Sequence, residues 1–74
     1  MTEEEIEIAK KSFGRRLQFL RETKGLSLLK MSYNCNIDES KISKIEKGRF
    51  NITLSTLLEL AKGLDVPPKE LLEF

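Results

Sequence analysis

Polar and basic side chains gather at helical spacing in the short segment from Glu39 to Lys47. Its serines and lysines can donate hydrogen bonds to base edges or phosphates, and the carboxylate of Glu39 can accept one from cytosine. Ile42 and Ile45 lie three residues apart, so a helix here would have one buried stripe and one hydrogen-bonding face. A short helix of this kind fits the major groove, which makes binding to double-stranded DNA the leading hypothesis.

The composition limits the chain to one small domain. Its 74 residues, 39% hydrophobic and 34% charged, fit a single globular domain over residues 1–74 with a modest core. No apolar run approaches the roughly 20 residues of a membrane-spanning helix, and the acidic N-terminus lacks a signal-peptide pattern. The lone cysteine, Cys35, excludes an intramolecular disulfide and suits a reducing compartment, so we expect a cytoplasmic protein.

Catalysis and metal binding have little support in the sequence. There is no histidine, the single cysteine falls on an expected core face, and the four glycines form no phosphate-binding loop. The carboxylates cluster in the first helix and near the C-terminus without a plausible pocket between them, and a zinc site lacks ligands. We therefore expect no enzyme activity, no cofactor and no metal.

The net charge of +1 hides an uneven distribution of charged residues. Residues 1–11 carry two bases and four acids, residues 12–51 nine bases and four acids, and residues 52–74 two bases and four acids. The net charges are therefore −2, +5 and −2, and the positive excess falls on the segment proposed to meet DNA. Phosphate neutralisation supplies most non-specific affinity for DNA, although an ordinary solvated surface is also compatible with this pattern.

Start and stop signals predict five helices and no strand. The first helix begins at a capping box, in which Thr2 can cap and Glu5 can reach back, and it ends at Gly25. Apolar residues three and four positions apart predict its buried stripe: Ile6, Ala9, Phe13, Leu17 and Leu20.

Three further helices and a short last one follow. Ser27 should cap a second helix that runs to about residue 34, and Asp38 a third over residues 39–47. Between them Asn36 marks the turn, because asparagine tolerates a positive φ better than most residues. Thr53 should cap a fourth helix, and Pro68 should open a short fifth. One face of the fourth is expected to contain its apolar residues: Leu54, Leu57, Leu58, Ala61 and Leu64.

The chain resembles the Cro/phage-repressor helix-turn-helix family of Xre-like regulators over about residues 13–72. The resemblance rests on the lead-in GRRLQFLRETKGLS, the I-x-x-I-E-x-G run that ends at Gly48, and the L-x-x-L-x-x-x-A-K-x-L run of the fourth helix. It implies an all-α, five-helix, lambda-repressor-like DNA-binding domain. It also implies a transcriptional regulator whose helix 39–47 reads the major groove.

The resemblance further assigns roles to single residues. Arg21 and Glu46 are implied to form a structural ion pair between the first helix and the end of the third. The implied base-reading positions are Glu39, Ser40, Ser43 and Lys44. The implied DNA-backbone positions are Ser27, Leu28, Lys41, Arg49, Phe50 and Asn51. Leu28 stands where the family commonly has glutamine, so only its backbone N–H could serve a phosphate, and Ser32 replaces a common alanine, so its hydroxyl needs a nearby carbonyl.

The sequence leaves a second interpretation open for several side chains. Lys41 and Lys44 are also compatible with ordinary solvated lysines. Glu39 has three open roles: accepting from cytosine, excluding bases that offer only acceptors, or favouring the helix N-terminus. Tyr33 is placed either to reach a phosphate or to pack its ring, and Cys35 is expected to be a small core residue.

A protein-interaction module, or an antitoxin with the same fold, is the alternative function. Ile8 and Phe19 fall opposite the core stripe of the first helix and, with Phe50 and Phe74, would offer a partner an exposed apolar surface. Within the DNA hypothesis, the N-I-T and I-D segments are similar to restriction–modification controller proteins. An orphan repressor is equally compatible.

A symmetric homodimer on a palindromic operator is expected, because one short helix makes few base contacts. Its half-site centres would lie about 34–36 Å apart, one turn of DNA. The contact surface is expected in the C-terminal region, unless its apolar residues close the core instead: Leu60, Pro67, Leu71, Leu72 and Phe74. No small-molecule effector and no membrane partner are expected.

Overall fold

The computed structural model describes all 74 residues and contains four α-helices, one 3₁₀ helix and no strand. The elements are α1 (Glu3–Thr23), α2 (Leu28–Ser32), α3 (Glu39–Glu46), α4 (Leu54–Leu64) and the 3₁₀ helix η1 (Pro68–Leu72). The all-α class is confirmed, but the expected short fifth helix is a 3₁₀ helix, so the structure has four α-helices and not five. A five-residue segment that opens with a proline makes few helical hydrogen bonds, and short pieces of this kind favour the tighter helix. No helix combines the length and the apolar character needed to cross a membrane.

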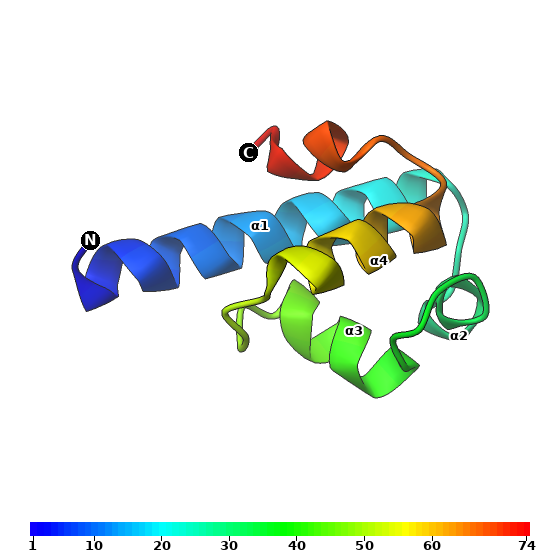
Figure 1. Cartoon of the computed structure of the whole chain (residues 1–74), viewed down its shortest axis with the longest axis horizontal. Coiled ribbons are helices and arrows are strands. Elements are labelled where there is room, and N and C mark those ends of the chain that lie inside the picture. Colours follow the sequence, from blue (N-terminus) through cyan, green and yellow to red (C-terminus); the bar gives the residue numbers. More distant parts are fainter.

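The long first helix sets the shape of the molecule, which measures 35 × 22 × 20 Å. The 21 residues of α1 span roughly 31 Å at 1.5 Å per residue, nearly the longest dimension. In Figure 1, α2 and α3 lie below α1, and η1 lies on the opposite side of it. Helix α1 packs against α3 and η1, α2 packs against α3 and α4, and α4 also packs against η1. The helix-turn-helix pair is therefore held between α1 and α4.

Side-chain caps begin all four α-helices, as the sequence predicts. The capping oxygens, each accepting from the N–H three residues further on, belong to Thr2, Ser27, Asp38 and Thr53. The capping box of α1 is complete, because Glu5 Oε1 also accepts from the N–H of Thr2 at 2.8 Å. The hydrogen bonds from the Thr2 backbone and side chain lower the pKa of Glu5. Each helix start is thus determined by a local signal that is readable from the sequence.

The ends of the helices depend on left-handed residues. Gly25 ends α1 with φ +69° and Gly48 follows α3 with φ +76°, as predicted. Asp65 takes φ +54° at the end of α4 and is the one non-glycine residue with a positive φ. The prediction that Asn36 uses its tolerance of positive φ is therefore wrong. Its N–H instead donates to Glu59 Oε1 at 3.0 Å, which ties the turn between α2 and α3 to α4.

Eleven apolar side chains form the core, and no polar or charged side chain is fully buried. Phe13, Leu17 and Leu20 supply the α1 stripe, while Ile6 and Ala9 are only half-buried. The other core residues are Met31, Ile37, Ile42, Ile45, Leu60, Ala61, Leu64 and Leu71. Burial of this apolar area supplies most of the folding free energy.

The predicted face of α4 is rotated in the structure. Leu60 and Leu64 lie at the centre of its buried side, with exposed fractions of 0% and 1%. Because each residue turns the helix by roughly 100°, Leu54 lies roughly 100° and Leu58 roughly 140° from that centre, outside the buried side. Their exposed fractions are 70% and 48%, so the face expected to hold the five apolar residues of α4 is only partly buried. The same rotation places Leu60 in the core and leaves two leucines of α4 in solvent.

Helix α1 and the end of α3 approach each other backbone to backbone at Gly14. A Cβ atom there would lie 2.6 Å from the carbonyl oxygen of Ile45 and would overlap the carbonyl group of Glu46. Glycine is thus required because no side-chain carbon fits between the two helices. The neighbouring backbone cannot move aside as the end of a flexible side chain could.

Replacing Gly14 with alanine should destabilise the fold, although alanine is favoured over glycine inside a helix by about 1 kcal/mol. We expect Gly14→Ala to lower the free energy of unfolding by roughly 1–3 kcal/mol, the usual cost of overpacking. Urea denaturation followed by circular dichroism measures the change. Thr23→Ala at an exposed α1 position is the matched control and should change stability little, whereas a Gly14→Ala protein as stable as the parent would contradict the close approach.

Candidate nucleic-acid interface

Helix α3 presents one continuous polar face. Ile42 and Ile45 are buried, so a rotation of roughly 100° per residue places Ser40, Lys44 and Lys47 at the centre of the opposite side. Lys41 and Glu39 lie on the two edges of that side: Lys41 is nearer Ile45, and Glu39 is nearer Glu46. Lys47 has no assigned role in the sequence interpretation, yet its spacing from Ser40 and Lys44 marks it as a third central position.

The four implied base-reading side chains are free of internal contacts. Glu39, Ser40 and Lys44 are exposed, while Ser43 is half-buried at the side of the face. None of the four side chains makes a hydrogen bond or ion pair within the chain. Their polar groups are therefore available to a ligand, and their contacts with bases stay predictions.

The turn between α2 and α3 is packed directly on α4. A Cβ atom at Gly63 would lie 3.0 Å from Cys35 Sγ, so the absence of a side chain at Gly63 allows Cys35 to pack against α4. Cys35 is half-buried, and its thiol lies 3.6 Å from the carbonyl of Met31. Asn34 Nδ2 donates to the carbonyl of Gly63 at 3.5 Å. These contacts hold the turn, from which α3 starts, against α4.

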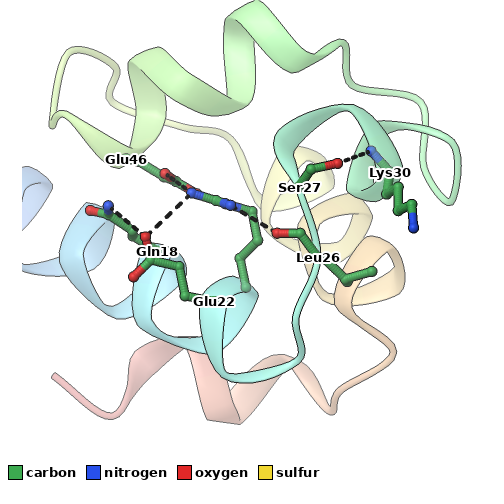
Figure 2. Close-up of polar contacts among 7 residues, drawn as sticks. Gln18, Glu22, Leu26, Ser27, Lys30 and Glu46 are labelled. Atoms are coloured by element: carbon green, nitrogen blue, oxygen red, sulfur yellow. Dashed lines mark hydrogen bonds and ion pairs between the residues drawn. The ribbon is translucent and has the colours of Figure 1, made fainter.

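At the start of α2, the group available to bind a phosphate is mainly the backbone N–H. The Ser27 hydroxyl is occupied as the helix cap, accepting from the N–H of Lys30 at 3.0 Å (Figure 2). The Leu28 side chain packs against the core, and its N–H has no hydrogen-bond partner in the chain. The hydroxyl of Ser32 donates to the carbonyl of Leu29 at 2.5 Å, as its position predicts. Tyr33 is 73% exposed, so the interpretation that its ring is packed is wrong.

The loop after α3 carries free cationic and amide groups beside a partly exposed ring. Arg49 and Asn51 are exposed, and their side chains make no internal hydrogen bond or ion pair. Phe50 is 39% exposed and has no polar side-chain atom, so only its backbone could reach a phosphate. The ammonium of Lys41 lies 5.9 Å from the centroid of the Phe50 ring. The edge of α3 and this loop therefore meet.

A bidentate ion pair joins α1 to the end of α3. Arg21 Nε lies 2.6 Å from Glu46 Oε2, and Arg21 Nη2 lies 3.1 Å from Glu46 Oε1. A third donor, Arg21 Nη1, reaches the carbonyl of Leu26 at 2.8 Å. In Figure 2 the dashed lines from the guanidinium reach Glu46, Glu22 and Leu26. One arginine thus contacts α1, the loop before α2 and the last turn of α3.

The pair is largely shielded from water, with exposed side-chain fractions of 11% for Arg21 and 7% for Glu46. Hydrogen bonding to Glu46 raises the pKa of Arg21, and burial acts in the opposite direction. Glu22 is 60% exposed at 3.9 Å and adds a weaker attraction. The arginine therefore stays charged throughout the range in which the protein is folded.

Comparison with known proteins assigns this arrangement to a family. Residues 14–73 match the family model described as "Helix-turn-helix domain". Control protein C.BamHI of Bacillus amyloliquefaciens is 35% identical over 63 residues, which cover 84% of this chain and 78% of that protein. The match includes all the elements that form the interface.

Solved structures agree with this assignment. The restriction-modification controller protein C.AhdI from Aeromonas hydrophila superposes with a TM-score of 0.82 at 38% identity, over 86% of this chain and 93% of that one. The controller protein C.Esp1396I, solved as a tetramer in complex with its natural 35 base-pair operator, gives a TM-score of 0.76 at 27% identity. That match covers 88% of this chain and 96% of the other.

Breaking the ion pair from one side should be costly. Glu46→Ala leaves the Arg21 guanidinium partly buried without its carboxylate, which costs about 3–5 kcal/mol in comparable buried pairs. We expect a similar loss of unfolding free energy here, measured by urea denaturation at neutral pH.

Two controls identify the cause of that loss. The double variant Arg21→Met with Glu46→Leu removes both charges and should recover part of the stability, because no charge is then stranded. Glu22→Ala removes the exposed neighbouring carboxylate and should cost no more than a surface pair does, roughly 0–1 kcal/mol. Equal stability of Glu46→Ala and the parent would show that the pair does not hold α3.

Proposed function

The chain belongs to the helix-turn-helix domain family and is homologous to restriction–modification controller proteins, and we propose that it is a sequence-specific DNA-binding transcriptional regulator. The observation that carries this proposal is the free polar face of α3 on a scaffold that fixes the angle of that helix. A helix presented in this way inserts into the major groove, where each base pair has a distinct pattern of donors and acceptors. We assign the chain no catalytic step.

Base reading falls to the exposed face near the start of α3. Glu39, Ser40, Ser43 and Lys44 present acceptors and donors that match base edges, and Lys44 is suited to guanine. Phosphates would be contacted from both sides of that face. On one side lie Ser27 and Leu28, through the free N–H at the start of α2, and on the other lie Lys41, Arg49, Phe50 and Asn51.

We propose that residues 1–74 act as one lambda-repressor-like domain, with η1 as its fifth helical element. Homology to controller proteins favours a controller over an orphan repressor. The target would then be a palindromic operator with half-site centres about 34–36 Å apart. Action on such DNA would take place in the cytoplasm.

A homodimer is proposed through α4 rather than through all the C-terminal residues expected from the sequence. Leu60 and Leu71 are 0% exposed and belong to the core, so they are unavailable to a partner. Leu54 and Leu58 are exposed on one side of α4, four residues apart, and Leu72 is also exposed at 55%. Exposed leucines on one side of a helix are typical of an interface that a second copy covers.

Two substitutions separate specificity from general affinity. Lys44→Ala should weaken binding to the preferred operator by about 1–3 kcal/mol and relax the preference at one base pair. Arg49→Ala should weaken binding to all sequences similarly and lower the salt slope by roughly one unit. Fluorescence anisotropy with selected and random duplexes at several salt concentrations measures both effects.

The same titrations test the proposed function as a whole. A parent protein that binds no duplex even at low salt would sink the DNA proposal and favour the protein-interaction alternative. An equal loss on every duplex for Lys44→Ala would reassign that lysine to the phosphates.

The α4 interface can be tested with a charge. Leu58→Lys should convert a dimer into a monomer at micromolar concentration, because two lysines would face each other across the two-fold axis without carboxylate partners. Light scattering measures the oligomeric state, and thermal melting checks the fold, which should persist because Leu58 is 48% exposed.

Phe19→Lys is the matched control for that experiment. Phe19 is 58% exposed on α1, away from the proposed interface, so its replacement should leave the dimer intact. If Phe19→Lys dissociates the dimer and Leu58→Lys does not, the apolar face of α1 is the contact surface instead.

A further inference from the structure

The contact between Lys41 and Phe50 joins the edge of α3 to the loop that follows it. The Lys41 ammonium lies 5.9 Å from the centroid of the ring, within the range of a cation–π interaction. No carboxylate pairs with this lysine in the structure. The only group that orients its charged end is therefore an aromatic face.

The Phe50 ring borders a mainly apolar cavity. Together with Phe13 and Phe74, it lines a cavity of about 160 Å³ between α1, the loop and the C-terminal residue. Phe74 packs edge-on against Phe13 with centroids 6.1 Å apart. The ring at position 50 thus has apolar residues across the cavity, and it remains partly exposed beside the lysine.

An aromatic partner differs from a carboxylate in one respect that matters for DNA binding. A carboxylate would orient the ammonium but would also cancel the charge that a phosphate attracts. The ring quadrupole attracts the cation and leaves the full positive charge in place. A lysine that is already oriented also loses less side-chain entropy when it meets its phosphate.

We propose that Phe50 is a positioning residue, which holds the ammonium of Lys41 at the edge of α3 as a preformed contact for a DNA phosphate. This inference rests on the proposed DNA binding, and it replaces a direct phosphate contact by Phe50 with an indirect role. Lys41 lies beside the loop that carries Arg49 and Asn51, so the three groups form one phosphate-binding edge. The central base-reading face then remains with Ser40 and Lys44.

A double-mutant cycle on DNA binding tests the proposal. Phe50→Leu keeps an apolar side chain over the cavity but removes the aromatic face. A cation–π contact at an exposed site corresponds to about a two- to fivefold change in affinity, and we expect Phe50→Leu to weaken binding by that factor on specific and random duplexes alike. The salt slope should be nearly unchanged, because the charge of Lys41 remains. Lys41→Met should lower the slope by roughly one unit.

The cycle has two decisive comparisons. Adding Phe50→Leu to Lys41→Met should cause no further loss, and Phe50→Tyr, which keeps the ring face, should bind like the parent. If Phe50→Leu weakens binding equally with and without Lys41, or leaves the parent affinity unchanged, the positioning role is overturned. Failure of the parent to bind DNA would instead overturn the proposed function.

A second measurement does not depend on DNA binding. In proton NMR spectra of the free parent protein, the ring current of Phe50 should shift the Lys41 side-chain methylene signals upfield of those of Lys44. Phe50→Leu should abolish this difference. Lys41 and Lys44 signals at the same positions in the parent would show that the ring does not hold the lysine, and would overturn the proposal.

Discussion

The ion pair between Arg21 and Glu46 is the interaction on which the orientation of α3 depends. The core beneath it is wholly apolar, and apolar burial has little directional preference, so packing alone would tolerate small rotations of one helix over another. A guanidinium and a carboxylate paired through two hydrogen bonds tolerate much less rotation. Because Gly14 has no side chain, the end of α3 packs directly on the backbone of α1, and Arg21 and Glu46 come within hydrogen-bonding distance. The ion pair then fixes the direction in which the polar face of α3 points.

Local signals predicted most of the fold, and tertiary contacts decided the rest. The caps at Thr2, Ser27, Asp38 and Thr53 were readable because a capping oxygen acts within three residues. The rotation of α4 was not readable, because leucines occur on more than one side and only the surrounding helices choose which side to bury. The turn at Asn36 was located correctly, but what holds it was misjudged for the same reason: its N–H is satisfied by a glutamate 23 residues away.

The candidate site, too, was only partly predictable from the sequence. The outer face of α3 follows from helical spacing, and the resemblance to a family supplied the roles of its residues. Lys47 belongs to the outward face that the sequence already indicated, but the family pattern assigned it no role. The contact of Lys41 with Phe50 could not be predicted from the sequence. The two residues lie on opposite sides of the end of α3 and of the left-handed Gly48, and packing of Gly48 on α1 sets the direction of the loop.

The first turns of α1 lie largely outside the core, and this divides the helix into two parts of unequal protection. From Glu3 to Ile8 most side chains are exposed, whereas Leu17 is fully buried. The capping box and neighbouring charges hold the first part, and tertiary packing holds the second. Backbone amides near the N-terminus should therefore exchange with solvent deuterium through local fraying, while those around Leu17 exchange only when the whole domain opens. The helix is continuous in shape, but we expect its first turns and its remainder to belong to different cooperative units.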